Sequence, residues 1–583
     1  MPELLIEIHS EEIPARMQNK AAEDFKKLFI DFFHKQNIKF SQNKVNAYCC
    51  PRRLVFVAED LQEIQVCPAK KITGPQINAP QKAIEGFLKS VGVKQVSELS
   101  QIENKKGQYY CFQLPKKEIK TIDILQDHLP QILQKMSNLW PKTMRWLSGQ
   151  NAIYWVRPIR NILAIFNQKI IPFKFGALSS NDKSYGHLFL SGKSFKVTNF
   201  ADYNKKLADN FVTLDAAKRK EIIINGIKAI CKKLNCYLVE NLENDNQLLN
   251  EVAGLVEYPQ VMYGQISQEF MSLPYEVLVL TVKRHQKYFC LKDKKGNLAP
   301  YFIFVSNVKG KDSNKIIADN EKVLSARLND AKFFIEEDLK ISLRQKVEDL
   351  RHLIFHEKLG SVFFKVKRLE ALNKFIAIWI PHASLSLAEK LADLAKSDLV
   401  TKGVAELPEL QGVIGKYYAQ IAGEDNEVSQ AIAEQYLPAG ADSELPKTPL
   451  GVLLSIADKI DTICGLFLVN EKPTGSKDPF ALRRLALGII RIIAHYQIHL
   501  PLKIIIDKAI NCFSIQTIKK VCPDKRGKEI KNFKKELSCQ IMSFFIDRLS
   551  FFLKDQSSLI WQYSHLIIPI NLHILKADLL CKI

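Results

Sequence analysis

The spacing of apolar residues changes near residue 340 of this 583-residue chain. Before that point, runs of strand length such as Glu3 to Ile8 and Ile162 to Phe175 alternate with helical segments such as Ala21 to Lys35. After Asp338, nearly every segment repeats its apolar residues at helical spacing. Mixed strands and helices are typical of α+β units, whereas continuous helical spacing is typical of helix bundles. A chain with both patterns is expected to fold as more than one part.

The length of the chain also exceeds what a single hydrophobic core usually supports. We therefore predict a multidomain α+β protein. Residues 1–340 are expected to form a mixed α/β body, which could divide into two sub-domains. Residues 341–497 are expected to form an all-α domain, and residues 498–583 a further helical region.

The chain carries a large excess of positive charge. It has 83 lysines and arginines against 62 aspartates and glutamates, which gives a formal net charge of +21. Such an excess favours a polyanionic partner, either nucleic acid or an anionic membrane surface. A membrane-spanning helix needs a run of about 18 apolar residues, and no such run is present. We therefore predict a nucleic-acid partner and no membrane.

The N-terminus and the cysteines predict a cytoplasmic protein. The opening MPELLIEIHSEE is acidic and lacks the basic and then apolar pattern of a signal peptide. The 12 cysteines are scattered and never form a Cys-x-x-Cys pair. This pattern favours reduced, mostly buried thiols over zinc sites or disulfides.

A stretch with strong local chemistry, PTGSKDPFALRR, joins two apolar helical runs at residues 473–484. Asp478 is a good N-cap, and Pro479 then falls at the first helical position, where its missing N–H costs little. Positive charge surrounds this predicted helix start, supplied by Lys477, Arg483 and Arg484. The stretch is therefore either a capped helix after a tight loop or a docking surface for phosphate or for a partner's carboxylates.

Two arginine motifs in the first half have alternative interpretations. Arg52 and Arg53 in PRRL could bind phosphates through their planar guanidinium groups, or could pair with the acidic Glu11–Glu12 turn. A second group of arginines flanks Trp146 and Trp155 and comprises Arg145, Arg157 and Arg160. Arginines interleaved with aromatics suit stacked bases, but arginine stems packed over a tryptophan core give the same pattern.

The densest basic and aromatic run is VKRHQKYF at residues 282–289. Its candidate RNA contacts are Lys283, Arg284, His285, Lys287 and Tyr288. The run is predicted to lie on an exposed strand, where alternate side chains point to opposite faces, so only half of them could touch one ligand. It is the best candidate for RNA contact that the residue types alone provide.

Four residues of the helical half are similar to the metal ligands of a helical HD phosphohydrolase, namely His382, Asp398, Asp458 and Asp461. The motif needs a His–Asp dyad, but the dyad here reads Ser397–Asp398. Without that imidazole the metal would lose a ligand, so metal binding is expected to be weak or absent. We predict an HD-like fold kept as a scaffold, with no metal.

PTGSKDPFALRR, with ADKIDTICGLF before it, resembles the β subunit of bacterial tetrameric glycyl-tRNA synthetase. The resemblance runs in order through further motifs and covers roughly residues 1–555: LLIEIHSEEIPARM, PRRL, MRW with VRPI, EVAGLVEYP, HQKYF, VSNV, ARLNDAKFFIEEDLK and PELQGVIGKYYA. Many long motifs in one order are far more specific than a single short pattern.

The resemblance implies a β subunit that binds tRNA(Gly) and is needed to attach glycine to it, in a tetramer of two α and two β chains. The α subunit makes glycyl-adenylate from glycine, ATP and magnesium, so no cofactor is expected on this chain. In agreement, the sequence has no HIGH-like, KMSKS-like or GxGxGxER segment and offers no catalytic residues. Two alternatives stay open: an HD-type metal-dependent phosphohydrolase, and a non-catalytic RNA-binding scaffold.

Members of this family continue into a helical anticodon-binding domain, whereas the resemblance here stops after Asp555. Residues 556–583 are apolar without a clean helical period, and Pro569 interrupts them. A shifted reading frame or a premature stop would produce such a tail. We expect the tail to pack poorly and the anticodon-side contacts to be weakened or lost.

Overall fold

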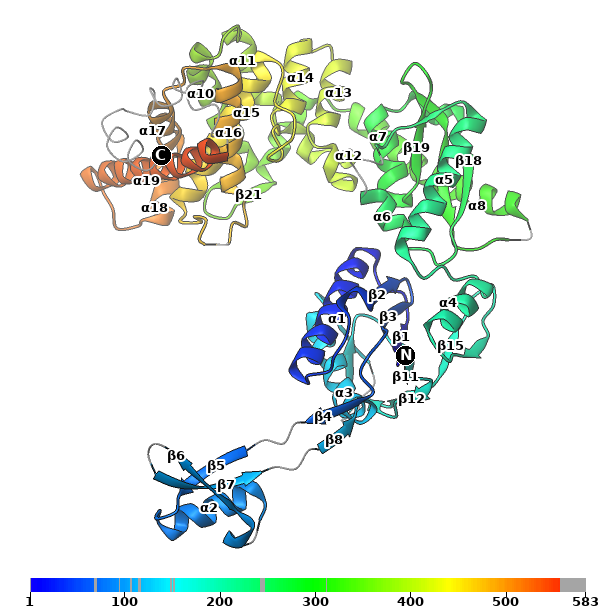
Figure 1. Ribbon diagram of the computed structural model, residues 1–583. Helices are drawn as coiled ribbons and strands as arrows, with labels where there is room; N and C mark the ends of the chain where they lie inside the picture. The colour runs from blue at the N-terminus through cyan, green and yellow to red at the C-terminus, as the bar shows by residue number, and fades with distance from the viewer. Residues whose placement is uncertain are drawn as a thin grey trace. The chain divides into compact units, whose positions relative to one another are not determined.

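The computed structural model describes residues 2–555, with gaps at 68–70, 94, 105–106, 114–116, 147–148, 150–151, 242–246, 311 and 476. The tail at 556–583, with its expected poor packing, lies outside the described residues. The chain divides into two compact units. The first comprises residues 1–266 and 282–322, and the second comprises residues 267–281 and those from 323 onward. The prediction of mixed α and β structure is confirmed (Figure 1).

A five-stranded antiparallel sheet organises the first unit, in the order β12–β11–β1–β3–β2. Its bounds are β1 Leu4–Ser10, β2 Val45–Cys50, β3 Arg53–Ala58, β11 Ile159–Phe166 and β12 Lys169–Ile170. The central strand β1 is buried along its whole length, because it pairs with β3 on one side and β11 on the other. This burial on both faces explains its nearly continuous apolar sequence.

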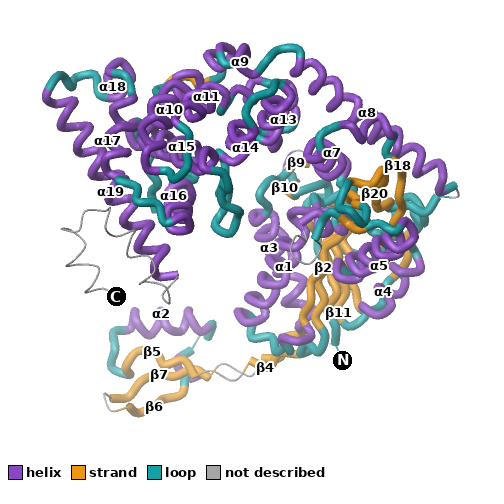
Figure 2. Tube along the Cα trace, turned by 90° about the horizontal axis from the view of Figure 1, so that it is seen from above, coloured by secondary structure: helices purple, strands orange, loops and turns teal. Residues whose placement is uncertain are grey.

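Two helices cover one face of this sheet, α1 at Ala15–Lys35 and α3 at Thr121–Leu139 (Figure 2). Phe25, Phe29 and Phe33 of α1 recur every four residues and pack on Phe56 of β3. The opposite face packs on α4, Phe200–Asp209, through Tyr203 and Leu207. The core of the unit therefore lies on both sides of the sheet.

Between β4, Ile64–Cys67, and β8, Lys117–Lys120, the chain forms a small inserted module. It has a three-stranded sheet in the order β5–β7–β6 and one helix. The bounds are β5 Lys71–Gln76, α2 Gln81–Val91, β6 Ser100–Asn104 and β7 Gly107–Gln113. Short hairpins follow it, formed by β9 Met144–Trp146 with β10 Ile153–Trp155, β13 Lys174–Phe175 with β14 Leu178–Ser179, and β15 Lys183–Tyr185 with β16 Ser194–Lys196.

A second sheet in the first unit has four strands in the order β17–β19–β20–β18. Their bounds are β17 Tyr237–Leu238, β18 Gln260–Gln265, β19 Phe289–Lys292 and β20 Leu298–Ser306. Helices α5, Ala216–Leu234, and α6, Gln247–Ala253, pack on it. Asp215 caps α5 by accepting from the Ala217 N–H, and Asn235 ends the helix in the left-handed conformation.

The second unit is almost wholly helical. Its helices are α7 Tyr275–Leu280, α9 Leu343–Lys346, α10 Val362–Ile376, α11 Leu385–Leu394, α12 Lys402–Glu406, α13 Val413–Ile421, α14 Asn426–Glu434, α15 Pro449–Leu468, α16 Leu482–Tyr496, α17 Leu502–Cys512, α18 Ile515–Val521 and α19 Lys528–Asp555. Helix α8, Ser313–Leu339, precedes α9, and a short hairpin joins β21 Ile354–His356 to β22 Gly360–Ser361. None of the described helices is long and apolar enough to cross a membrane.

Helix α15 is the centre of the second unit, because it packs against α10, α14, α16, α17 and α19. Nearly every residue from Leu450 to Leu468 is buried, which fits a sequence that is apolar all round the helix. Thr448 caps it by accepting from the Gly451 N–H, and Pro449 occupies the first turn.

We expect Phe29→Ala to destabilise the first unit by about 3–5 kcal/mol, because it leaves a cavity among buried aromatic rings. The Phe29 side chain is fully buried and its ring centroid lies 3.9 Å from that of Phe56. Lys27→Ala changes an exposed position of the same helix and should alter stability by less than about 0.5 kcal/mol. Denaturant unfolding followed by circular dichroism would compare the two, and equal midpoints would contradict this assignment of the core.

Candidate functional site

The arginines of PRRL are engaged inside the first unit. Arg53 is fully buried, with its Nε 3.1 Å from Glu257 Oε1 and its Nη1 3.4 Å from Glu7 Oε2. Arg52 is also buried and pairs with Glu11 at 2.9 Å. The internal ion pair is therefore what the structure shows for Arg52. The buried Arg53 offers no surface to a phosphate, which corrects its interpretation as an RNA contact.

Arg53 belongs to a buried polar cluster that joins separate elements of the first unit. Ser184 of β15 donates to Glu7 Oε1 at 2.8 Å, and the Tyr203 hydroxyl of α4 donates to Glu7 Oε2. Burial, followed by the charge of Glu7, raises the pKa of Tyr203 well above its usual value. These hydrogen bonds and ion pairs join β1, β3, β15 and α4 inside the unit, so the role of the cluster is structural.

The second arginine group divides between exposed and engaged positions. Arg160 donates to Glu11 Oε1 at 2.5 Å, and Arg157 donates to the Val156 carbonyl at 3.1 Å. Arg145 is exposed on β9, where it lies directly across the ladder from Tyr154 of β10, which is also exposed. An exposed arginine beside an exposed aromatic ring is a combination that can stack on a base.

Trp155, a tryptophan of this region, cannot stack on a base. Trp155 is fully buried and its ring lies edge-on to Trp140 at 5.7 Å, so it belongs to the core. The aromatic partner of Arg145 is instead Tyr154, which was not predicted from the sequence. The alternation of β10 could have identified it, since a strand that buries Trp155 must point its neighbours outward.

The run VKRHQKYF does not form the exposed strand that we predicted. Thr281–His285 is a π-helical turn, and strand β19 begins only at Phe289. The turn continues directly from α7, which overrides the strand pattern. Arg284 and His285 lie on the surface, whereas Lys283 is half-buried.

The last two candidates of the run have partners within the first unit. Tyr288 is buried, stacks on Phe302 with ring centroids 4.9 Å apart, and donates to Asn320 at 2.5 Å. Burial raises the pKa of Tyr288 to about 12. The Lys287 ammonium lies 3.1 Å from Glu251. Tyr288 is therefore part of the core and cannot stack on a base, so the surface candidates of this run are Arg284 and His285.

The stretch at 473–484 forms a tight loop before α16, but the helix begins later than predicted. Asp478 accepts from the backbone N–H groups of Leu482 and Arg483 at 2.9 and 3.0 Å, so it caps the helix from further upstream. Ala481 adopts a left-handed conformation with φ of 54° and places the first helical residue at Leu482. Pro479 therefore precedes the helix rather than starting it, because the carboxylate spans the intervening loop.

The charges around this loop are not equivalent. Arg483 donates to the Gly475 carbonyl at 2.8 Å and so fastens the loop to the helix. Lys477 and Arg484 are exposed and point their charges to solvent. The capped helix is thus observed, and docking of phosphate or carboxylates at Lys477 and Arg484 stays a prediction.

The aspartates compared with HD metal ligands are neutralised by basic side chains. The Lys365 ammonium lies 3.0 Å from Asp458 Oδ1 and 3.1 Å from Asp461 Oδ2. Arg368 binds Asp461 through two bonds of 2.6 and 3.1 Å, and Lys396 lies 3.0 Å from Asp458. Burial alone would raise the pKa of Asp458, but Lys365 and Lys396 outweigh it and hold the pKa well below its usual range.

The positive charge next to these carboxylates therefore comes from lysine and arginine side chains of the same chain. The exposed His382 adds no ligand to them, and the described residues contain no group of three metal-ligating side chains. Lys396 also lies over the Tyr436 ring at 4.1 Å, which further fixes its position. The HD-like arrangement of these helices stays a prediction.

Asp398, the remaining aspartate compared with HD metal ligands, is buried and is hydrogen-bonded to a backbone N–H group. Its Oδ2 accepts from the Gly412 N–H, and its Oδ1 has no hydrogen-bond partner among the described residues. Burial raises the pKa of Asp398 to about 6, although the Gly412 N–H and Lys396 act in the opposite direction. A buried carboxyl with a raised pKa is typical of functional sites, but burial in a structural cluster produces the same shift.

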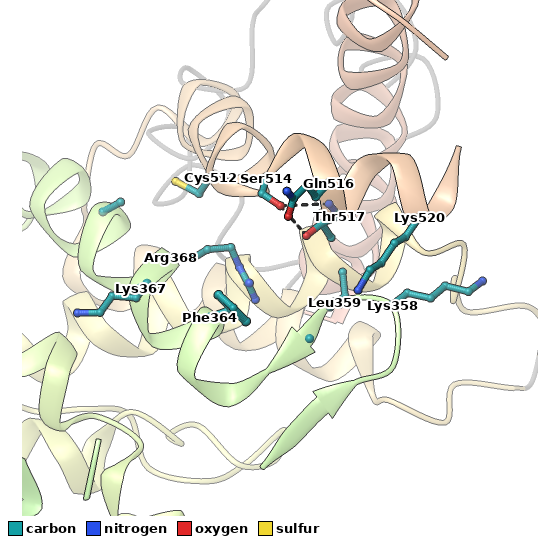
Figure 3. Close-up of a pocket in the computed structure, with 12 residues that line it drawn as sticks. Lys358, Leu359, Phe364, Lys367, Arg368, Cys512, Ser514, Gln516, Thr517 and Lys520 are labelled. Carbon is teal, nitrogen blue, oxygen red and sulfur yellow. Dashed lines mark hydrogen bonds between the residues drawn. The ribbon is translucent and has the colours of Figure 1, made fainter. Parts of the chain in front are cut away.

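A basic pocket of about 420 Å³ lies in the second unit between the start of α10 and the segment joining α17 to α18 (Figure 3). It is lined by Lys358, Leu359, Gly360, Phe364, Lys367, Arg368, Ala371, Cys512, Ser514, Gln516, Thr517 and Lys520. None of these residues was predicted from the sequence to form a site. They come from segments about 150 residues apart, so the basic and aromatic run FFKVKR at residues 363–368 marks only one side of the pocket.

Comparison with known proteins places these features in a family. The sequence profile described as "Glycyl-tRNA synthetase beta subunit" matches residues 4–562. The chain is 40% identical over 558 residues to the glycine–tRNA ligase beta subunit of Rickettsia felis, a match that covers 95% of this chain and 78% of the relative. The corresponding subunits of Rickettsia conorii and Rickettsia bellii are 40% and 39% identical, over 556 and 557 residues.

The pH dependence of stability provides a test of the buried Asp398. The pKa of Asp398 in the folded chain, about 6, lies above the ordinary 3.8. Folding therefore favours the neutral carboxyl, and the stability that this form contributes is present below pH 3.8 and is lost as the pH rises through 6. Asp398→Asn mimics the neutral acid. We expect the stability advantage of the variant over the unmodified chain to grow by about 2 kcal/mol between pH 4 and pH 7.

Urea unfolding at several pH values would measure this gain. Asp442→Asn is the matched control, because it removes the same charge at an exposed position of the second unit. A constant stability difference between Asp398→Asn and the unmodified chain across the range would show that Asp398 is ionised throughout.

Proposed function

Because the chain belongs to the glycyl-tRNA synthetase beta subunit family, it is a subunit of the ligase that attaches glycine to tRNA, and we propose that its own part is to bind tRNA(Gly). On this proposal, a separate α subunit activates glycine with ATP and magnesium, and this chain contributes RNA and subunit contacts. The two subunits would form an α2β2 tetramer in the cytoplasm.

The observation that carries this proposal is the pairing of Asp458 and Asp461 with Lys365, Arg368 and Lys396. Carboxylates that could have held a catalytic metal are committed to ammonium and guanidinium groups. Such a cluster supports a scaffold rather than a phosphohydrolase. The chemistry of glycine activation would then belong to the partner chain.

The exposed basic groups that we propose as RNA contacts lie on β9, in the π-helical turn at Thr281–His285 and around the start of α16. In the first unit, Arg145 with Tyr154 and Arg284 with His285 are exposed. In the second unit, Lys477 before α16 and Arg484 in its first turn are exposed. With a formal charge of +21, such groups would draw tRNA to the chain through its phosphates.

We expect the isolated chain to catalyse no glycine-dependent exchange between ATP and pyrophosphate, because its sequence lacks the ATP-binding motifs of both synthetase classes. Exchange should appear when the α subunit is present. The measurement follows radiolabelled pyrophosphate into ATP, with glycine omitted as the control. Glycine-dependent exchange by this chain alone would refute the assignment of activation to the partner.

We expect tRNA(Gly) binding by the chain to weaken steeply with salt, because basic side chains displace counterions from phosphates. Arg145→Ala combined with Arg284→Ala should reduce the slope of log K against log salt concentration by about 1 to 2. Tyr288→Phe should leave that slope unchanged, because the Tyr288 side chain is buried.

Filter binding of labelled tRNA over a range of potassium chloride concentrations would measure these slopes. A slope that stays the same in the arginine double variant would move the RNA surface away from Arg145 and Arg284. Absence of tRNA binding by the unmodified chain at low salt would contradict the proposed role itself.

A further inference from the structure

We propose that the basic pocket of the second unit binds one unpaired nucleotide of an RNA, with the base on Phe364 and the phosphate between Lys358 and Lys520. This inference rests on the proposed function, since it assigns part of the RNA contact to a specific pocket. Figure 3 shows the two lysines on one side of the pocket and Phe364 across from them.

The charge in the pocket is only partly balanced by the protein. Lys367 lies 3.2 Å from Glu370 and from Asp393, and Arg368 is bound to Asp461. By contrast, Lys358 and Lys520 are exposed and form no ion pair within the described part of the chain. Two like charges held at one side of a concave site favour an anion between them.

Phe364 provides an aromatic surface that the protein does not cover. Its side chain is 54% exposed, although it lies in the first turns of α10. A Cβ added at Gly360 would come 3.2 Å from the Phe364 ring, so the glycine lets the ring lie close to the backbone. Gly360 also has a φ of +89°, a conformation that favours glycine. An exposed ring backed in this way is suited to stacking on a base.

Polar groups complete the lining opposite the hairpin. The hydroxyl groups of Ser514 and Thr517 lie 2.9 Å apart and are hydrogen-bonded to each other, and the Gln516 side chain is exposed beside them. Hydroxyl and amide groups can donate to phosphate or ribose oxygens as well as to base edges. The pocket thus combines cations, hydrogen-bonding groups and one aromatic ring.

The size of the pocket limits what can enter it. About 420 Å³ is within the usual range of small-ligand pockets, which suits a single nucleotide. A base in a duplex is stacked on both faces and cannot reach Phe364. The ligand should therefore be a nucleotide from a loop or a single-stranded end rather than from a helical stem.

The test uses the full chain, labelled tRNA(Gly) and two probes of equal length, a single-stranded octauridylate and an eight-base-pair RNA duplex. Lys358→Ala combined with Lys520→Ala should weaken tRNA and octauridylate binding about tenfold and reduce the salt slope by about 1. Phe364→Ala should weaken octauridylate binding at least about fivefold with an unchanged slope. Neither change should alter duplex binding.

Lys519→Ala combined with Lys390→Ala is the matched control, because it removes two exposed charges of the same unit outside the pocket. Equal binding by the pocket variants and this control would overturn the proposal, while tRNA binding by the unmodified chain would keep the proposed function. Sensitivity to the lysines but not to Phe364 would also overturn it, because the site would then hold a phosphate without a base.

Discussion

The ammonium of Lys365, held between Asp458 and Asp461, is the interaction on which the second unit depends. The two aspartates lie on the buried helix α15, and their counter-charges come from α10 and from Lys396 just after α11. Removal of one partner would leave a buried charge unpaired, at a cost of about 3–5 kcal/mol. The helices around α15 are therefore held together by ion pairs as well as by apolar packing. Arg368, which pairs with Asp461, also lines the basic pocket beside α10.

The core of the first unit also contains buried ion pairs. Arg53 of β3 pairs with Glu7 of β1 and with Glu257, while Ser184 and Tyr203 complete the hydrogen bonds of Glu7. Arginines that looked like ligands in the sequence thus hold the sheet to the elements around it. Because these arginines are buried, the candidates for RNA contact are exposed groups such as Arg145, Arg284, Lys358 and Lys520.

Local patterns of apolar spacing predicted the strand at Glu3–Ile8 and the helix at Ala21–Lys35, which are observed as β1 and α1. Local patterns failed where contacts with adjacent elements decide the conformation. The start of VKRHQKYF forms a π-helical turn because it continues directly from α7. Asp478 caps α16 from further upstream than predicted, across a longer loop. Burial of Arg53 and Tyr288, and the pocket around Phe364, depend on contacts between distant segments that no single window contains.

The central claim is that this chain serves a ligase without performing the activation chemistry itself. The most direct measurement is the rate of glycyl-tRNA(Gly) formation from glycine and ATP, with this chain alone, with the α subunit alone and with both. We expect attachment of glycine only when both chains are present, with a rate that saturates as this chain is added. Formation of glycyl-tRNA by this chain alone, or an undiminished rate by the α subunit alone, would contradict it.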